Sequence, residues 1–131
     1  MRCSLTAFFL SGLILVAPAS AWAEGALRLL ECRLQQACDS SATCEPADGE
    51  VEFSMEPLEL DANGSGSYNI NYDDNEAEMQ ARSFAGPFLW TVNGEMHSLL
   101  ANSETSFLWH RLAFEPTPEA TITFMACEFT Q

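Results

Sequence analysis

Apolar and polar residues alternate one by one over several short segments of this chain. In 51–60, valine, phenylalanine and methionine alternate with glutamate and serine, and in 67–72 two tyrosines and an isoleucine alternate with serine and asparagine. A period of two residues places one kind of side chain on each face of a strand. The same pattern predicts further strands over 88–92, 97–101, 106–114 and 120–129, with a weaker one over 77–84.

Turn residues separate these segments. Asn93-Gly94 is a strong signal for a two-residue hairpin, and 61–66 (DANGSG) reads as another turn. Pro57 shifts the phase of the alternation in 51–60, which predicts a bulge or an edge strand there. Residues 27–37 fit both a helical and a strand period; we favour a strand, and we expect 38–49 to form a loop.

About eight short strands with turn chemistry between them predict an all-β fold, a single small antiparallel barrel or sandwich. We expect one domain, over residues 24–131. The first 23 residues read as a cleavable signal peptide, with Arg2 before an apolar run that is too short to span a bilayer comfortably, and with Ala21 and Ala23 at the cleavage site. Cleavage after Ala23 predicts a periplasmic or secreted protein.

Four cysteines follow the predicted cleavage site: Cys32, Cys38, Cys44 and Cys127. An even number in a small exported domain predicts two disulfides, for which three pairings exist. We favour Cys38–Cys44 as a local link and Cys32–Cys127 as a link between the first and last elements. The spacings do not match a zinc site, so we expect no metal ligands among them.

Charge narrows the range of partners. After cleavage, 4 arginines face 19 acidic residues with no lysine, a net charge of −15. This balance opposes binding to nucleic acid or to anionic membranes, and it favours solubility, the binding of cations or a basic protein partner. We expect no nucleic acid or membrane partner after signal removal, no cofactor, and a monomer.

Motifs for catalysis are not visible, so we expect a protein that is not an enzyme. A hydrolase would need a nucleophile or a metal arrangement that the sequence does not display. Asp61, Asn63 and Ser65 match the start of an EF-hand loop, but Tyr72 stands where the bidentate glutamate belongs, and a hairpin turn explains them better. We read His110 as a partly buried structural histidine.

Segment 106–114 carries bulky residues on both faces, Phe107 and Trp109 on one and Leu108, Leu112 and Phe114 on the other. One explanation is a central strand covered on both sides, which we favour because large exposed apolar patches are rare. The other is an exposed patch of Phe107, Trp109 and Arg111, residue types that are enriched at binding hot spots. These three are our candidate binding residues.

Two segments carry a resemblance. At GPFLW (86–90) and TFMACE (123–128) the chain resembles a group of small exported proteobacterial proteins with an early cysteine cluster and a cysteine in the last strand. The resemblance implies export and disulfides rather than an activity. In size, export and a Cys32–Cys127 link the chain is also similar to periplasmic inhibitors of C-type lysozyme, which are eight-stranded barrels, although their inhibitory loop motif does not map onto it.

The first hypothesis for function is therefore a non-enzymatic binding or inhibitor module for a basic protein partner. The second is a barrel that binds a small ligand or a metal ion, through its mouth or through clustered acids, namely Glu45, Asp48, Asp73, Asp74 and Glu76. A hydrolase is the third and least favoured.

Overall fold

The computed structural model describes residues 26–130, over which it contains nine β-strands and no helix. The strands are β1 (Arg28–Asp39), β2 (Cys44–Pro46), β3 (Glu50–Leu60), β4 (Gly66–Tyr72), β5 (Asn75–Ala81), β6 (Phe88–Val92), β7 (Glu95–Ala101), β8 (Ser106–Ala113) and β9 (Glu119–Thr130). The all-β prediction is confirmed, and the segment 27–37, for which we favoured a strand, forms most of β1, which begins at Arg28 and continues to Asp39. The predicted signal peptide, 1–23, lies outside the described residues.

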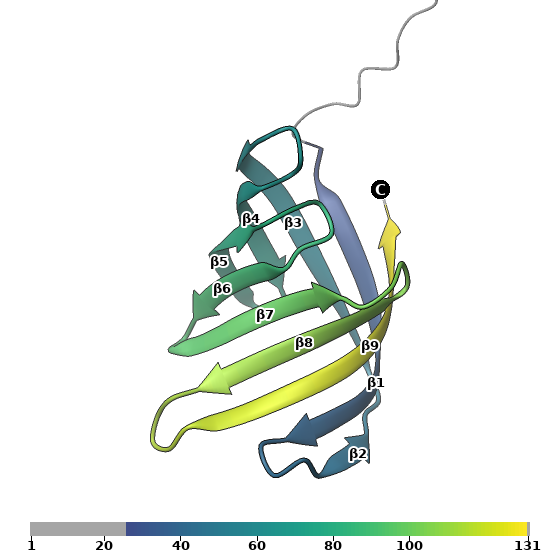
Figure 1. Ribbon diagram of the computed structural model, residues 1–131, viewed down its shortest axis with the longest axis vertical. Coiled ribbons are helices and arrows are strands. Elements are labelled where there is room, and N and C mark those ends of the chain that lie inside the picture. Colours follow the sequence, from purple (N-terminus) through teal and green to yellow (C-terminus); the bar gives the residue numbers. More distant parts are fainter. Residues whose placement is uncertain (1–25, 131) are drawn as a thin grey trace, which may run out of the picture.

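Eight of the strands close into one antiparallel barrel (Figure 1). From β3 to β9 each strand pairs with the next along the chain, β1 pairs with β3, and β9 returns to pair with β1. At that seam Cys32 lies directly opposite Cys127, and the two form a disulfide, which confirms the predicted link between first and last elements. Because β1 pairs with both β3 and β9, each of the eight barrel strands has a partner on both sides.

The alternating apolar residues fill the interior of the barrel. Phe53, Met79, Leu99 and Met125 are 0% exposed, and they come from alternate strands around the barrel, namely β3, β5, β7 and β9. Phe53 packs edge-on against Trp109, with 5.2 Å between ring centroids. Interior positions of small barrels are filled by side chains, so this barrel encloses a packed core.

A register shift between Pro57 and Glu59 interrupts the pairing of β3 with β4, which confirms the predicted irregularity at Pro57. Beyond it, Gly66 approaches the carbonyl oxygen of Glu59 so closely that a Cβ on Gly66 would clash, and its φ of 140° is one that L-residues rarely adopt. The Asn93-Gly94 hairpin is also confirmed, with positive φ at both residues and Val92 paired with Glu95.

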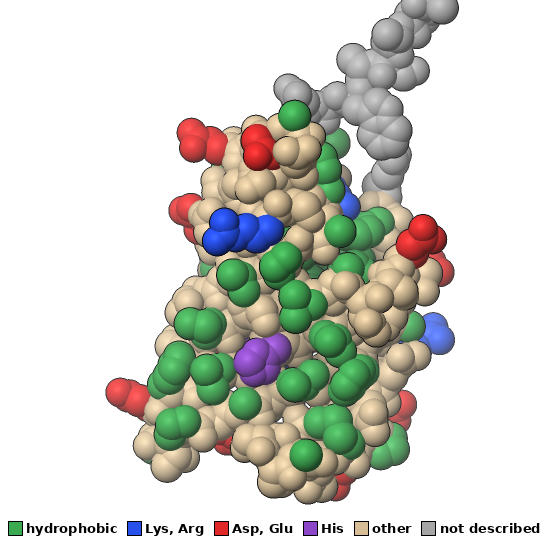
Figure 2. All heavy atoms as spheres, viewed as in Figure 1, with side chains coloured by type: hydrophobic (Ala, Val, Ile, Leu, Met, Phe, Trp, Pro, Cys, Tyr) green, Lys and Arg blue, Asp and Glu red, His purple; other side chains and the backbone are tan. Residues whose placement is uncertain are grey.

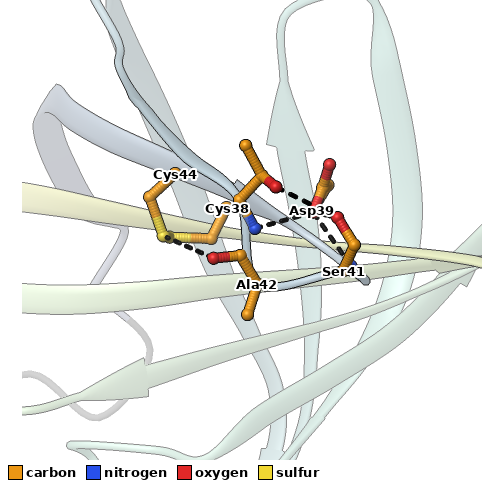
Figure 3. The surroundings of a disulfide bond; sticks show 6 residues. Cys38, Asp39, Ser41, Ala42 and Cys44 are labelled. Carbon is orange, nitrogen blue, oxygen red and sulfur yellow. Dashed lines mark hydrogen bonds between the residues drawn. A yellow bond between two sulfur atoms is a disulfide. The ribbon is translucent and has the colours of Figure 1, made fainter.

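The expected loop over 38–49 contains one element that we did not predict, the three-residue strand β2. It pairs with the end of β1, and the predicted Cys38–Cys44 disulfide joins the two strands (Figure 3). In the turn, the Asp39 carboxylate accepts hydrogen bonds from the hydroxyl of Ser41 and from the backbone N–H of Ser41 and Thr43. These hydrogen bonds lower the pKa of Asp39 below its usual range, with the largest effect from the Ser41 hydroxyl and the next from the Thr43 N–H.

Candidate functional site

The three candidate binding residues lie on one face of β8, and that face points into the barrel. Phe107 and Trp109 are only 1% and 7% exposed, which excludes a surface row made of these two side chains. Arg111 is partly buried at the end of the same row. The opposite face of β8 carries Leu108, His110 and Leu112, all partly buried, so β8 is fully covered on its inner side and only partly on its outer side, unlike the strand covered on both sides that we favoured. The partial burial of His110 is as predicted.

Near one end of the barrel, Trp109 and Arg111 join a polar aromatic cluster that sequence reasoning did not assemble. His97 on β7 pairs in register with Trp90 on β6 and with Arg111 on β8. The His97 ring stacks on Trp90, with 5.0 Å between centroids and 5° between planes. The Arg111 guanidinium lies over the Trp109 ring at 4.8 Å from its centroid, a cation–π geometry.

Two indole N–H groups determine the hydrogen bonding of this cluster. Trp109 Nε1 donates to Nδ1 of His97 at 3.2 Å, and Trp90 Nε1 donates to the Tyr72 hydroxyl at 3.2 Å. Because an indole N–H can only donate, Nδ1 of His97 is the acceptor and the neutral ring carries its proton on Nε2. In this arrangement Nε2 has no lone pair in the ring plane to offer a metal ion.

Burial also shifts the pKa of two residues in this cluster, His97 and Tyr72. Desolvation lowers the pKa of His97, an effect that Glu95 opposes and Arg111 reinforces. Desolvation likewise raises the pKa of Tyr72, while its hydrogen bond from Trp90 acts in the opposite direction. Near neutral pH both groups are therefore uncharged, and Arg111 is the cation of the cluster.

A pocket of about 130 Å³ opens at this end, between the β4–β5 and β6–β7 hairpins. Its lining includes Tyr72, His97, Trp109 and Arg111 from the strands, and Asp73 and Glu95 beside the turns. An amide hydrogen bond from Asn93 to Asn75 at 3.0 Å links the two hairpins. Over residues 26–130, Nε2 of His97 and Nε of Arg111 are buried without a hydrogen-bond partner.

A second feature covers the outside of β6 to β9, where apolar side chains gather around a histidine (Figure 2). Register places Leu100, Leu108 and Phe124 side by side in one row, and a second row runs from Leu89 through Ser98 and His110 to Ile122. Met96 and Leu112 lie in a third row. We call the apolar members of these rows the apolar wall: Leu89, Met96, Leu100, Leu108, Leu112, Ile122 and Phe124.

Five of the seven side chains of the apolar wall are exposed, Leu108 and Leu112 are partly buried, and none of the seven is charged. Exposed fractions are 48% for Met96, 42% for Leu89 and 36% for Phe124, and the rows contain no Asp, Glu, Lys or Arg. The outward positions of β3 and β5 differ, since they carry Glu50, Glu52, Glu56, Glu76 and Glu78. The outer surface therefore has one apolar side and one acidic side.

No grouping of three or more His, Cys, Asp or Glu side chains suited to a metal ion occurs in the described part of the chain. Asp61, which starts the EF-hand-like segment, uses its carboxylate inside the turn, accepting from the backbone N–H of Asn63 at 2.8 Å and of Ser65 at 3.0 Å. The turn interpretation of that segment is thus the one that the structure shows. In residues 26–130, no helix is long and apolar enough to cross a membrane.

Comparison with protein-family models, with curated proteins and with solved structures gives no match. Sequence reasoning selected Trp109 and Arg111 for their residue types, but it missed Tyr72 and His97. The signal that could have found His97 is its position in β7, where alternation with Leu99 places it on the inward face.

Proposed function

We propose that this protein is an exported, non-enzymatic binding module that docks a basic protein partner on its apolar wall. The observation that carries the proposal is the contiguous apolar surface across β6 to β9, with seven apolar side chains in adjacent rows and no charge among them. Monomeric proteins rarely expose large contiguous apolar patches, and such patches mark interaction sites.

The negative net charge of the protein supports a basic partner. The chain carries a net charge of −14, with 5 basic residues against 19 acidic ones, and β3 and β5 present glutamates beside the apolar side. A second copy of the chain would bring the same negative charge and be repelled. A partner with an apolar patch inside a basic surround would be attracted over a distance and then held by apolar contact.

The test is a binding measurement with variants of the wall. The double variant Leu100→Thr/Phe124→Thr removes apolar surface from the wall, while threonine still favours a strand. The matched control is Leu58→Thr, since Leu58 is 54% exposed on β3, away from the wall. A partner is captured by photocrosslinking from the cell envelope, identified, purified and titrated by calorimetry. C-type lysozyme serves as the first defined basic probe.

We expect a basic partner whose affinity falls at least 10-fold with the wall variant and is unchanged with Leu58→Thr. Affinity should also fall between about 50 and 500 mM salt, where screening shortens to a few Å. Equal affinity for the wall variant would disprove docking on this surface. Wall-dependent dimerisation, or wall-dependent binding to lipid vesicles, would replace the proposed partner with a second copy or a membrane.

A further inference from the structure

Two buried N–H donors at the end of the barrel lack acceptors. His97 is only 4% exposed, yet its Nε2 has no partner over residues 26–130, and the same holds for Nε of Arg111. Nearly all buried polar groups in folded proteins are paired, and leaving one unpaired is destabilising. Both residues line the same pocket, so an acceptor group bound there would lie beside both side chains.

Tyr72, which also lines the pocket, supplies a further donor through its hydroxyl. It accepts from Trp90 Nε1, and a hydroxyl has one proton of its own, so its O–H remains able to donate. The inner lining therefore offers donors from three strands, β4, β7 and β8. A carboxylate, with two oxygens and several lone pairs, matches such a set better than a hydroxyl or an ether.

Charge adds a second requirement. The pocket lining holds one cation, Arg111, and two acids, Asp73 and Glu95. A simple anion would be attracted by Arg111 and repelled by both acids. A ligand that also carries an ammonium group would place that group beside the acids, so that each of its charges faces the opposite sign.

We propose that this pocket binds a small zwitterion, an α-amino acid with a short side chain, with its carboxylate on His97 and Arg111 and its ammonium toward Glu95 and Asp73. The volume of about 130 Å³ suits a molecule of that size, being equal to roughly four water molecules of liquid at about 30 Å³ each. The site is distinct from the apolar wall, because its strand residues, Tyr72, His97, Trp109 and Arg111, lie on the inward faces of their strands, whereas the residues of the wall lie on outward faces.

The test follows the indole N–H signals of Trp90 and Trp109 in ¹H–¹⁵N spectra of the oxidised protein. Both groups donate to residues that line the pocket, so an occupant should move both signals. Titrations use alanine as the zwitterion, with acetate and methylammonium as probes that each carry one of its charges. We expect saturable shifts with alanine at millimolar concentration or below, and at least 10-fold weaker binding of either single-charge probe.

Two variants separate the pocket from the rest of the fold. Arg111→Gln removes the cation, and His97→Phe removes the Nε2 donor while keeping a ring to stack on Trp90. Each should weaken alanine at least 10-fold, whereas Arg33→Gln, which alters only an exposed ion pair with Glu50, should leave binding unchanged. Signal dispersion reports whether each variant is folded.

Three outcomes would overturn the proposal. The first is no shift with alanine up to 100 mM, which means that solvent alone fills the pocket. The second is acetate binding as tightly as alanine, which removes the role of the acids. The third is unchanged alanine binding in both folded variants, which places the ligand elsewhere.

Discussion

His97 is held in its neutral form by one hydrogen bond and by burial. Trp109 occupies Nδ1, and desolvation lowers the pKa of the ring below its usual value near 6.5. Protonation would place a charge beside the Arg111 guanidinium, although Glu95 would partly offset it. The barrel should therefore resist protonation of His97, and that resistance couples the stability of the fold to pH.

We expect the free energy of unfolding to fall as pH drops from about 7.5 to 5.5. In that window the unfolded chain binds a proton at residue 97 and the folded chain does not, so acid favours unfolding, by at most about 1.4 kcal/mol per pH unit for one proton. Urea unfolding at several pH values measures this. In His97→Gln, whose amide can replace both ring nitrogens, the fall should be smaller, and in the control His110→Gln it should persist. A fall that is the same in both variants would mean that His97 is not the source.

At the scale of strands, the two disulfides act on very different lengths of chain. Cys32–Cys127 joins β1 to β9 at the seam, with a sequence separation of 95, and Cys38–Cys44 closes a hairpin with a separation of 6. On the chain-entropy model, loops of these lengths are worth about 4.7 and about 2 kcal/mol, because the longer link removes more freedom from the unfolded chain.

Removal of the seam disulfide should therefore destabilise the barrel about twice as much as removal of the hairpin disulfide. The comparison uses Cys32→Ala/Cys127→Ala and Cys38→Ala/Cys44→Ala in urea unfolding. Reduction of the native protein, which breaks both bonds, is the control. If the hairpin variant loses as much stability as the seam variant, the hairpin bond acts through native packing rather than through loop length.

The alternation of apolar and polar residues predicted most of the strands, because each barrel strand has one face in the core. The alternation in 67–72 and 106–114 reports burial directly. It could not predict β2, whose three residues all lie exposed and whose strand form depends on pairing with the end of β1. It also left barrel and sandwich open, since closure depends on β1 meeting β9 at the far end of the chain.

The candidate site was predictable only in part, for a related reason. Aromatic and arginine content drew attention to β8, but the pocket depends on Tyr72 and His97, which reach it from β4 and β7. Only the inward alternation of each strand, combined with the register between them, brings these groups together. The apolar wall was visible as bulk on both faces of 106–114, yet its extent required the neighbouring strands β6, β7 and β9.

At the scale of the whole molecule, the net charge of −14 affects the stability of the fold and, under the proposed function, the attraction of a basic partner. Glutamates crowd the outer side of β3 and β5, and folding brings these charges closer together than they are in an unfolded chain. Salt screens this repulsion, because the Debye length falls from about 30 Å at 0.01 M to about 10 Å at 0.1 M. The folded barrel should thus gain more from added salt than the unfolded chain does.

We therefore expect the melting temperature to rise by a few degrees between about 10 and 200 mM NaCl, measured by circular dichroism. Calcium chloride at equal ionic strength is the discriminating control, since the clustered acids, Asp73 and Asp74 among them, form no metal-binding group within 26–130. The same rise with both salts indicates screening alone. A larger rise with calcium would show a cation site and restore the ion-binding hypothesis, and no rise with either would mean that repulsion between the acidic side chains contributes little to the stability of the barrel.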